Sequence, residues 1–329
     1  MSRCCAITSP ACARHDNPDH PESNARLMIA CGGIPPDVPV LAPVSATLPE
    51  IARVHSPGYL HWLRSLCERT RAVQFIDADT YVTPHSFAVA CDAAGAAIQS
   101  VDCALDGAHC FSLMRPPGHH AEHERAMGFC LLNNAAIGVA HALETVDRVA
   151  IVDWDVHHGN GTEHCFYGTD RVLYCSVHEE GIFPYTGAPQ ETGYGVGEGF
   201  TINAPLACGC TGADYAAVFS DIFVPAIRRF NPDLVVISAG QDILFDDPLG
   251  SMAVQPHDFF FLTRLLRDSV DTPLALILEG GYSPSQGTAI TWIFRALAGE
   301  RAPDVPVSGE PQESTTDLMA LLRRIHRHL

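Results

Sequence analysis

The most informative segment of the chain reads Val149-Ala150-Ile151-Val152-Asp153-Trp154-Asp155-Val156-His157-His158-Gly159-Asn160-Gly161. It begins with consecutive apolar residues, and such a run is typical of a strand that is buried on both faces of a parallel sheet. In the extended chain that follows, Asp153, Asp155 and His157 alternate onto one face. A carboxylate and an imidazole at this spacing can therefore converge on one cation.

Similar apolar runs alternate with helical patterns over most of the chain. The alternation implies right-handed βαβ crossovers. It predicts an α/β domain with three α/β/α layers and a mainly parallel central sheet. We expect strands at Cys5–Thr8, Cys110–Met114, Val149–Asp153, Val172–Val177, Leu234–Ser238 and Leu274–Glu279. We expect helices from Pro84 to about Ser100, from Asn134 to Leu143, from Tyr215 to Ala226 with a kink at Pro225, and from Asp258 to Val270.

The C-terminal part of the chain begins with a linker-like stretch. Residues 302–313 are rich in proline, valine and acidic residues, and an amphipathic helix is expected at about 314–329. Its apolar side carries Leu318, Leu321, Leu322, Ile325 and Leu329. We expect this helix to dock on the same domain, so that residues 1–329 form a single domain.

Composition and charge exclude several classes of protein. The 329 residues are 47% hydrophobic and 18% charged, as in a well-packed enzyme rather than a disordered chain. The net charge of −18 offers no basic surface for phosphates, so we expect no nucleic-acid partner. No apolar run approaches the roughly 20 residues that cross a bilayer, so we expect no membrane segment.

The cysteines indicate a reducing compartment. Thirteen cysteines are scattered through apolar segments without a CxxC pair, and the first residues lack the apolar core of a secretory signal. This pattern favours reduced, buried thiols and a cytoplasmic location.

A second expected strand supplies a further metal ligand. Ligands of open parallel sheets bind at the carboxyl ends of the strands, and the strand Leu234–Ser238 leads into Ala239-Gly240-Gln241-Asp242. Together, Asp155, His157 and Asp242 would form a three-ligand site with an open position for water, as a catalytic zinc requires. Taken alone, each segment is also consistent with acids that cap helices or pair with arginine.

Two further motifs follow expected strands. The segment Arg115-Pro116-Pro117-Gly118-His119-His120 places tandem histidines where imidazoles can act in acid–base catalysis. In Leu278-Glu279-Gly280-Gly281-Tyr282, the glycines allow a sharp turn that delivers a phenol towards the site. Taken alone, the second motif fits a buried core tyrosine better.

In combination, these motifs resemble the histone deacetylase family, which includes acetylpolyamine amidohydrolases and bacterial deacetylase-like amidohydrolases. The resemblance runs from His20-Pro21-Glu22 to Tyr282 with the motifs in the same order, and it includes Gly128-Phe129-Cys130 and Asp246-Asp247-Pro248-Leu249-Gly250. Asn160 resembles the residue of the class II and bacterial branch. The resemblance implies an arginase/deacetylase-like fold and zinc-dependent hydrolysis of an N-acyl amide.

The resemblance also implies a role for each motif residue. One zinc ion per chain would be bound by Asp155, His157 and Asp242. The catalytic residues would be His119, His120 and Tyr282, with Asp153 and Asn160 as the partners of the two imidazoles. His120 would be the general base, and Tyr282 would donate a hydrogen bond to the oxyanion.

Substrate and potassium sites are implied in the same way. The substrate channel would be lined by Gly128, Phe129, Phe183 and Leu249, with Asp79 as a carboxylate at its rim. A nearer structural potassium would be bound by backbone oxygens of Asp153, Asp155, His157 and Val177, together with Ser176. A farther potassium would be bound by Phe166, Thr169 and Val172.

Several positions depart from the family pattern next to the site. Gln241 stands where an aromatic residue is common, Ile243 and Leu244 replace the usual Ala-His, and Ile182 occupies the place of a second aromatic. These departures predict an altered pocket shape or polarity. None of them removes a catalytic group.

Four interpretations of function remain open at this stage. The first is deacylation of acyl-lysine in proteins or peptides, and the second is hydrolysis of an acylpolyamine or another small amide or ester. The third is a metal-binding scaffold that has lost catalysis, and the fourth is a manganese ureohydrolase with two metals. The partner is expected to be an acylated amine, and the sequence leaves open whether the chain forms a homo-oligomer.

Overall fold

The computed structural model describes residues 3–326, and its core is a parallel sheet. Eight strands lie in the order β2-β1-β5-β10-β9-β6-β7-β8, and every neighbouring pair is parallel. Their bounds are β1 (Arg3–Ile7), β2 (Val40–Leu41), β5 (Ala108–Ser112), β6 (Val149–Asp153), β7 (Val172–Glu179), β8 (Thr201–Leu206), β9 (Leu234–Ala239) and β10 (Leu274–Leu278). A separate antiparallel pair consists of β3 (Gln74–Phe75) and β4 (Tyr81–Val82). The predicted mainly parallel sheet is confirmed.

All six expected strands are present, with ends that shift by one or two residues. Two strands of the sheet were not expected from the sequence. The short strand β2 is exposed and has no hydrophobic run. The strand β8 contains Asn203 and Pro205, which interrupt its apolar pattern. Because β8 lies at the edge of the sheet, Pro205 is tolerated there.

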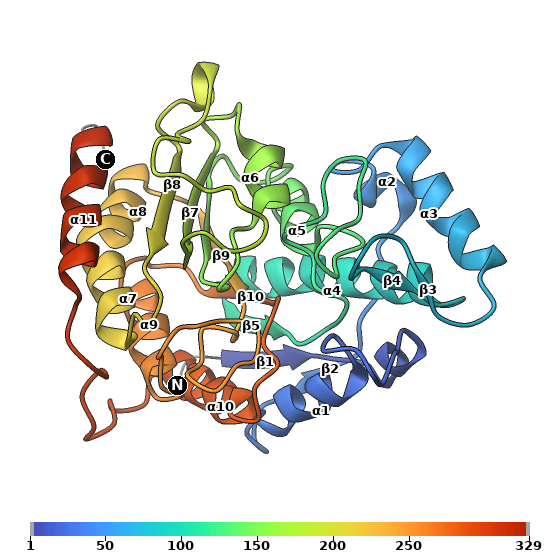
Figure 1. Cartoon of the computed structure of the whole chain (residues 1–329), viewed down its shortest axis with the longest axis horizontal. Helices are drawn as coiled ribbons and strands as arrows, with labels where there is room; N and C mark the ends of the chain where they lie inside the picture. The colour runs from blue at the N-terminus through green and yellow to red at the C-terminus, as the bar shows by residue number, and fades with distance from the viewer. Residues whose placement is uncertain (1–2, 327–329) are drawn as a thin grey trace.

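Helices cover both faces of the sheet (Figure 1). On one face, α4 and α5 pack over β5, β10 and β9, and on the other face α1, α9 and α10 pack together. The bounds are α1 (Asn24–Gly32), α2 (Leu48–Ile51), α3 (Pro57–Arg69), α4 (Ser86–Leu105), α5 (Asn134–Ala142), α6 (Asn160–Phe166), α7 (Gly212–Val218), α8 (Val224–Phe230), α9 (Asp258–Arg267), α10 (Gln286–Leu297) and α11 (Glu313–Ile325). The three-layer arrangement agrees with the predicted fold class.

The expected helix from Tyr215 to Ala226 contains a π-helical turn. This turn, Phe219–Phe223, separates α7 from α8, and Pro225 is the second residue of α8. A π-helical turn is a common cause of a bend in a helix, and this one lies just before the proline. The kink at Pro225 stays a prediction.

The C-terminal helix packs against β8 and α7 at the edge of the sheet. Its Met319 and Leu322 are buried, and among the described residues the helix spans Glu313–Ile325. Leu329, predicted on its apolar side, lies outside the described residues. The single-domain organisation remains a prediction.

Helix α4 is long and apolar enough to cross a membrane by length and composition alone. Two-thirds of its most apolar window is buried inside the protein, against β5, β10 and α5. This burial accounts for its apolar character, because a core helix between a sheet and another helix has little solvent-facing surface.

The sheet order brings four loops to one edge. Strands β5, β10, β9 and β6 are consecutive neighbours, and because they are parallel, their carboxyl ends meet on the same side. The segments that follow these strands carry His119, Tyr282, Asp242 and Asp155, respectively. These residues therefore meet at one edge of the sheet, as expected from their positions after the strands.

We predict that one buried histidine makes the fold sensitive to acid. His55 donates from Nδ1 to the carbonyl of Glu122 (2.9 Å), and its Nε2 accepts from the N–H of Asn133 (2.8 Å). Only the neutral ring can do both, and burial lowers the pKa of His55 from 6.5 to about 4. As the pH falls, the unfolded chain therefore binds this proton at a higher pH than the folded chain does. The contribution of His55 to the free energy of unfolding is complete above pH 6.5 and is lost as the pH falls towards 4.

The loss attributable to His55 is on the order of 3 kcal/mol, measurable by urea unfolding between pH 7 and pH 4. His55→Gln should reduce this pH dependence, whereas His61→Gln, at an exposed position on α3, should leave it unchanged. Equal pH dependence in the wild type and His55→Gln would contradict the prediction.

Candidate active site

A buried guanidinium holds the loop that carries the tandem histidines. The side chain of Arg115 is fully buried, and its Nε donates to Glu22 Oε1 (2.9 Å) while Nη2 donates to the phenol oxygen of Tyr81 (2.9 Å). It also donates to the carbonyls of Cys12 and His15. The position of the loop after β5 is therefore fixed by five polar groups from the N-terminal third of the chain.

The same carboxylate binds a second guanidinium. Arg26 donates to Glu22 Oε1 from Nε (3.1 Å) and Nη2 (3.0 Å), and its Nη1 donates to the carbonyl of Glu279 (2.9 Å). The Arg26 guanidinium also lies over the Tyr282 ring, 5.2 Å from its centroid. Glu22 thus connects the histidine loop after β5 with the tyrosine loop after β10.

The carboxylate of Glu279 ties these two loops together directly. Its Oε2 accepts from the N–H of Gly118 (2.6 Å) and of His119 (3.0 Å), and its Oε1 accepts from the hydroxyl of Ser238 (3.1 Å). Burial raises the pKa of Glu279 to about 7. Three donors therefore hold a fully buried carboxyl group directly behind the site.

Each of the tandem imidazoles has its own partner. His119 Nδ1 lies 3.0 Å from Asp153 Oδ2, and His120 Nδ1 lies 2.8 Å from Asn160 Oδ1. The two ring centroids are 4.0 Å apart. These are the pairs expected from the sequence, and they place Asp153 and Asn160 behind the imidazoles rather than in the cavity.

The pKa values of the two imidazoles are shifted in opposite directions. Burial opposes a charge on His119, but Asp155 and Asp153 outweigh it and raise the pKa of His119 to about 10. Burial, together with the neighbouring His119 and His157, lowers the pKa of His120 well below 6.5. Because Asn160 offers a neutral oxygen, His120 donates its Nδ1 proton to it and keeps a free lone pair on Nε2.

Three of the predicted ligands form a compact donor cluster. The ligand atoms of Asp155, His157 and Asp242 all lie within 4.8 Å of one another. His157 Nδ1 is 3.2 Å from Asp155 Oδ1 and 3.3 Å from Asp242 Oδ2. The two segments that follow β6 and β9 thus present two carboxylates and one imidazole to a common point.

The cluster has the properties expected of a cation site. The Oδ2 atom of Asp242 is buried without a hydrogen-bond partner, and burial together with Asp155 raises the pKa of Asp242 to about 8. The other carboxylate oxygens are held by backbone donors, from Val156 to Asp242 Oδ1 (2.8 Å) and from Gly280 to Asp155 Oδ2 (2.7 Å). A divalent cation would satisfy the unpaired oxygen and offset the repulsion between the carboxylates.

Glycines are required where the backbone approaches these carboxylates. A Cβ atom at Gly280 would collide with the carboxylates of Asp242 and Asp155, and one at Gly240 would collide with Asp155. The glycine of the tyrosine loop therefore permits the N–H contact to Asp155 as well as the turn predicted from the sequence.

A cavity of about 170 Å³ opens onto this cluster. Phe183 packs edge-on against His120 (5.0 Å between centroids), and Phe129 packs edge-on against Tyr282 (5.9 Å). The backbone of Gly128 has a φ of +55°, and a Cβ there would collide with His120. The lining residues are Asp79, Pro117, His119, His120, Gly128, Phe129, Asp155, His157, Phe183, Asp242, Leu249, Gly280 and Tyr282.

The cavity therefore contains every predicted zinc ligand, both histidines, the tyrosine and all five predicted substrate-binding residues. Asp79 lies at the partly exposed rim, where Asp77 Oδ1 accepts from the N–H of Asp79 (3.1 Å) and of Thr80 (2.7 Å). Burial and the neighbouring Asp77 raise the pKa of Asp79. The carboxylate of Asp77 therefore lies next to Asp79, although Asp77 itself does not line the cavity.

Apart from Asp155 and His157, the residues predicted to bind potassium do not line this cavity. Ser176 is the register partner of Asp153 on the neighbouring strand, and its hydroxyl lies 2.9 Å from His178 Nδ1. Phe166, Thr169 and Val172 lie between the end of α6 and the start of β7, where the N–H of Thr169 donates to the carbonyl of Phe166 (3.2 Å). Their role in binding potassium remains a prediction.

The unusual residues next to Asp242 do not line the cavity. Gln241 is fully buried, and its Oε1 accepts from Nε2 of Gln286 (3.2 Å). Ile243 and Leu244 are fully buried in the core, and Ile182 packs against the same core cluster. Any effect of these departures on pocket shape is therefore indirect.

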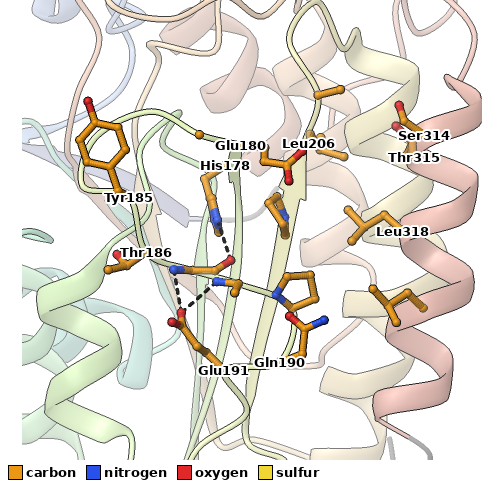
Figure 2. A pocket seen from close by; sticks show the side chains of 17 residues that line it. His178, Glu180, Tyr185, Thr186, Gln190, Glu191, Leu206, Ser314, Thr315 and Leu318 are labelled. Carbon is orange, nitrogen blue, oxygen red and sulfur yellow. Dashed lines mark hydrogen bonds between the residues drawn. The ribbon is translucent and has the colours of Figure 1, made fainter.

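A larger cavity of about 550 Å³ lies between the loop after β7, the edge strand β8 and α11 (Figure 2). Its polar groups are already engaged locally, since His178 Nε2 lies 3.1 Å from the carbonyl of Gly187 and Glu191 accepts from the N–H groups of Gly187 and Ala188. It contains none of the predicted ligands or catalytic residues. The converging chemical groups lie in the smaller cavity.

Some residues that shape the site were not assigned a role from the sequence. They include Glu22, Arg26 and Tyr81, which hold Arg115, and Asp247, whose Oδ2 accepts from the N–H of Tyr282 (2.6 Å). Glu22 and Asp247 lie within quoted motifs, but nothing in the local spacing indicates their partners. The only possible sign of a buried ion pair in the sequence is that a carboxylate and an arginine each stand among apolar residues.

Comparisons with known proteins agree with this geometry. A family model described as the histone deacetylase domain matches residues 17–297. A probable deacetylase of Archaeoglobus fulgidus is 35% identical over 92% of this chain and 87% of its own length. A histone deacetylase-like amidohydrolase of Pseudomonas aeruginosa is 36% identical over 90% of this chain and 80% of its own length. The chain spans 51% of the length of histone deacetylase 5 of Arabidopsis thaliana.

Similarity extends to the three-dimensional structure. The crystal structure of the HDA15 HD domain superimposes with a TM-score of 0.92 and 30% sequence identity, covering 100% of this chain and 95% of that domain. The match confirms the predicted α/β fold with a mainly parallel sheet.

We predict that the carboxyl group of Glu279 is a structural requirement of the histidine loop. Glu279→Ala would leave the buried N–H groups of Gly118 and His119 without an acceptor, at a cost of about 1–3 kcal/mol each. Glu279→Gln keeps one oxygen for these donors and a second polar group for Ser238. Urea unfolding should therefore show a loss of about 2–5 kcal/mol for the alanine variant and a much smaller one for glutamine. Equal losses would contradict this role.

Proposed function

The chain belongs to the histone deacetylase family, and we propose that it uses one zinc ion to remove the acyl group from acyl-lysine in proteins or peptides. Membership makes it a deacetylase or amidohydrolase, that is, a hydrolase that acts on amides. The observation that carries the zinc proposal is the cluster of Asp155, His157 and Asp242 with its unpaired buried oxygen, facing the histidines and the tyrosine across one small cavity.

The donor set fits zinc in number and kind. Two carboxylates and one imidazole are three of the four ligands of a tetrahedral catalytic zinc site, which leaves one position for water. When bound, zinc would polarise the acyl carbonyl and lower the pKa of water. Among residues 3–326, the cluster at this edge offers ligands for one metal, which does not support a two-manganese ureohydrolase.

His120 is suited to move the protons of the reaction. Its Nδ1 proton is held by Asn160, so that Nε2 is free to accept a proton from the attacking water. The same nitrogen can then return that proton to the amine as the carbon–nitrogen bond breaks. His119, held by Asp153, would keep a positive charge next to the developing negative charge.

Tyr282 is suited to stabilise the oxyanion that forms on the acyl carbon. Its backbone N–H is anchored to Asp247, and its ring is held between Arg26 and Phe129. A phenol positioned in this way can donate a hydrogen bond that is strongest in the transition state. The guanidinium of Arg26 would also favour the polarised phenol.

The mouth of the cavity supports a protein or peptide substrate. Phe129 and Phe183 form apolar walls for an alkyl chain. Next to this wall, His20 packs against Phe129 (4.7 Å between centroids) and against Phe75, which is 48% exposed. An exposed aromatic beside a pocket favours contact with a polypeptide surface. Asp79 would then accept hydrogen bonds from the substrate backbone.

A second candidate substrate is an acylpolyamine. The paired carboxylates of Asp77 and Asp79 and the net charge of −18 favour a cationic amine at the rim. An inactive scaffold is disfavoured, since all metal ligands, both histidines and the tyrosine are present in one cavity.

Structural potassium and a cytoplasmic location are part of the same proposal. The adjacency of Ser176 and Asp153 in the sheet supports the nearer potassium site, and the short connection from Phe166 to Val172 supports the farther one. No disulfide joins any of the thirteen cysteines, all of which lie among the described residues, and this is consistent with a reducing compartment.

We predict that Tyr282→Phe lowers turnover without removing the metal. Loss of one oxyanion donor typically reduces kcat by about 10²–10³-fold, whereas the zinc ligands remain in place. Metal analysis should therefore find about one zinc per chain in both proteins, and kinetics on an acetyl-lysine peptide should show the loss.

The matched control is Tyr185→Phe, because Tyr185 is exposed on the loop that follows the channel wall. It should retain full turnover. Unchanged turnover in Tyr282→Phe would remove this residue from the mechanism, and two manganese ions per chain would refute the zinc assignment.

We predict that Asp79 contributes to substrate binding rather than to chemistry. Asp79→Asn should raise KM for an acetyl-lysine peptide by about tenfold, because one charged hydrogen bond is worth about 1.5–3 kcal/mol, and it should leave kcat unchanged. Asp317→Asn, at an exposed site on α11, serves as the control. A panel of acetyl-lysine peptide, longer acyl-lysines and acetylspermidine completes the test, and turnover of acetylspermidine alone would refute the proposed protein substrate.

A further inference from the structure

Three cysteines that are distant in sequence meet at one point of the fold. They are Cys5 in β1, Cys103 in the last turn of α4 and Cys110 in β5. Their sulfur atoms all lie within 4.8 Å of one another. The sequence contains no CxxC pair, so the spacing gave no sign of this cluster.

The sheet and α4 create the cluster together. Cys5 and Cys110 are register partners in neighbouring parallel strands, so their side chains point to the same face. Helix α4 packs on this part of the sheet, where the hydroxyl of Ser100 donates to the carbonyl of Cys110 (2.8 Å). Cys103 then reaches the two strand cysteines from the helix. Because Cys110 precedes the carboxyl end of β5, the cluster is separate from the candidate active site.

The environment of the cluster suits a metal with an affinity for sulfur. Cys110 is fully buried and Cys5 is nearly so, whereas Cys103 is partly exposed and provides a route of entry. The three side chains offer a ligand set made only of sulfur, and the thiolate is the form of cysteine that binds metals.

We propose that Cys5, Cys103 and Cys110 bind one soft, thiophilic metal ion, of which Cu(I) is the representative. A metal–sulfur distance of about 2.3 Å places three sulfurs around a central ion about 4 Å apart, which is compatible with the observed spacing. Thiolate ligands select soft ions such as Cu(I), whereas structural zinc almost always takes four protein ligands. No fourth histidine, cysteine or carboxylate joins this group among the described residues.

Binding requires no oxidant or reductant. The ion takes the place of the protons on the three thiols, and these protons are released to solvent. The bound ion would link β1, β5 and α4. Because an ion that binds only the folded chain stabilises it by mass action, the melting temperature should rise with bound metal.

The test is a titration of the reduced, zinc-loaded protein with Cu(I), carried out without oxygen against a competing chelator. The prior zinc load keeps the Asp155, His157 and Asp242 cluster occupied. We expect the wild type to bind one Cu(I) ion. Cys103→Ser should bind it at least about tenfold more weakly, because even the loss of a group that only supports a metal ligand lowers the affinity by about 10–100-fold. Cys208→Ser, at an exposed cysteine outside the cluster, should match the wild type.

Two further measurements make the outcome decisive. X-ray absorption at the copper edge should show three sulfur neighbours in the wild type, and the melting temperature should rise on copper binding in the wild type but not in Cys103→Ser. Cys103 is chosen because it is the partly exposed member of the cluster, so that a serine there should disturb folding less than a serine at Cys5 or Cys110. Circular dichroism checks that the variant is folded. If that variant is misfolded, Cys5→Ala takes its place. Equal Cu(I) binding by the wild type and the cluster variant, or two sulfur neighbours in place of three, would overturn the proposal.

Discussion

The charge pairing of Glu22 with two arginines is the interaction on which the rest of the site depends. The carboxylate accepts from Arg115 on one side and from Arg26 on the other, and all three side chains are buried. Arg115 holds the loop that carries the tandem histidines, and Arg26 holds the loop that carries Tyr282. Removing one partner of a buried ion pair typically costs about 3–5 kcal/mol, because the remaining charge is left uncompensated. Both halves of the site therefore depend on a single carboxylate outside the cavity.

The site itself is built from an excess of buried negative charge. Asp153, Asp155, Asp242 and Glu279 all lie at the carboxyl ends of neighbouring strands and are fully buried. Backbone N–H groups and the histidines satisfy most of their oxygens, but Asp242 Oδ2 accepts no hydrogen bond from the described residues and has only His157 Nδ1 nearby, at 3.3 Å. Such an arrangement is stable only with compensating positive charge. In a histone deacetylase family member, the proposed zinc would supply that charge and also the chemistry of the reaction.

Much of this could be predicted from the sequence, because strand ends carry local patterns. The alternation of Asp153, Asp155 and His157 after an apolar run indicated which side chains meet, and parallel strands bring their ends to one edge. The edge strand β8 was not expected, since Asn203 and Pro205 interrupt its pattern. The pairing of Glu22 with Arg115 joins residues 93 positions apart in the chain and leaves no local signal. Gln241 was expected to alter the pocket, yet it faces Gln286, because side-chain direction after a strand end depends on tertiary packing.

One wall of the channel, Phe183, belongs to a different part of the architecture from the catalytic groups. The metal ligands and histidines follow directly from the central sheet, whereas Phe183 lies on the loop after β7, which also borders the larger cavity against α11. That loop is held by its own contacts, such as the bond from His158 Nδ1 to the hydroxyl of Thr186 (2.8 Å). The width of the channel can therefore change separately from the reactivity of the site. Substitutions in the loop after β7 would change which acyl groups fit, while the catalytic residues stay the same.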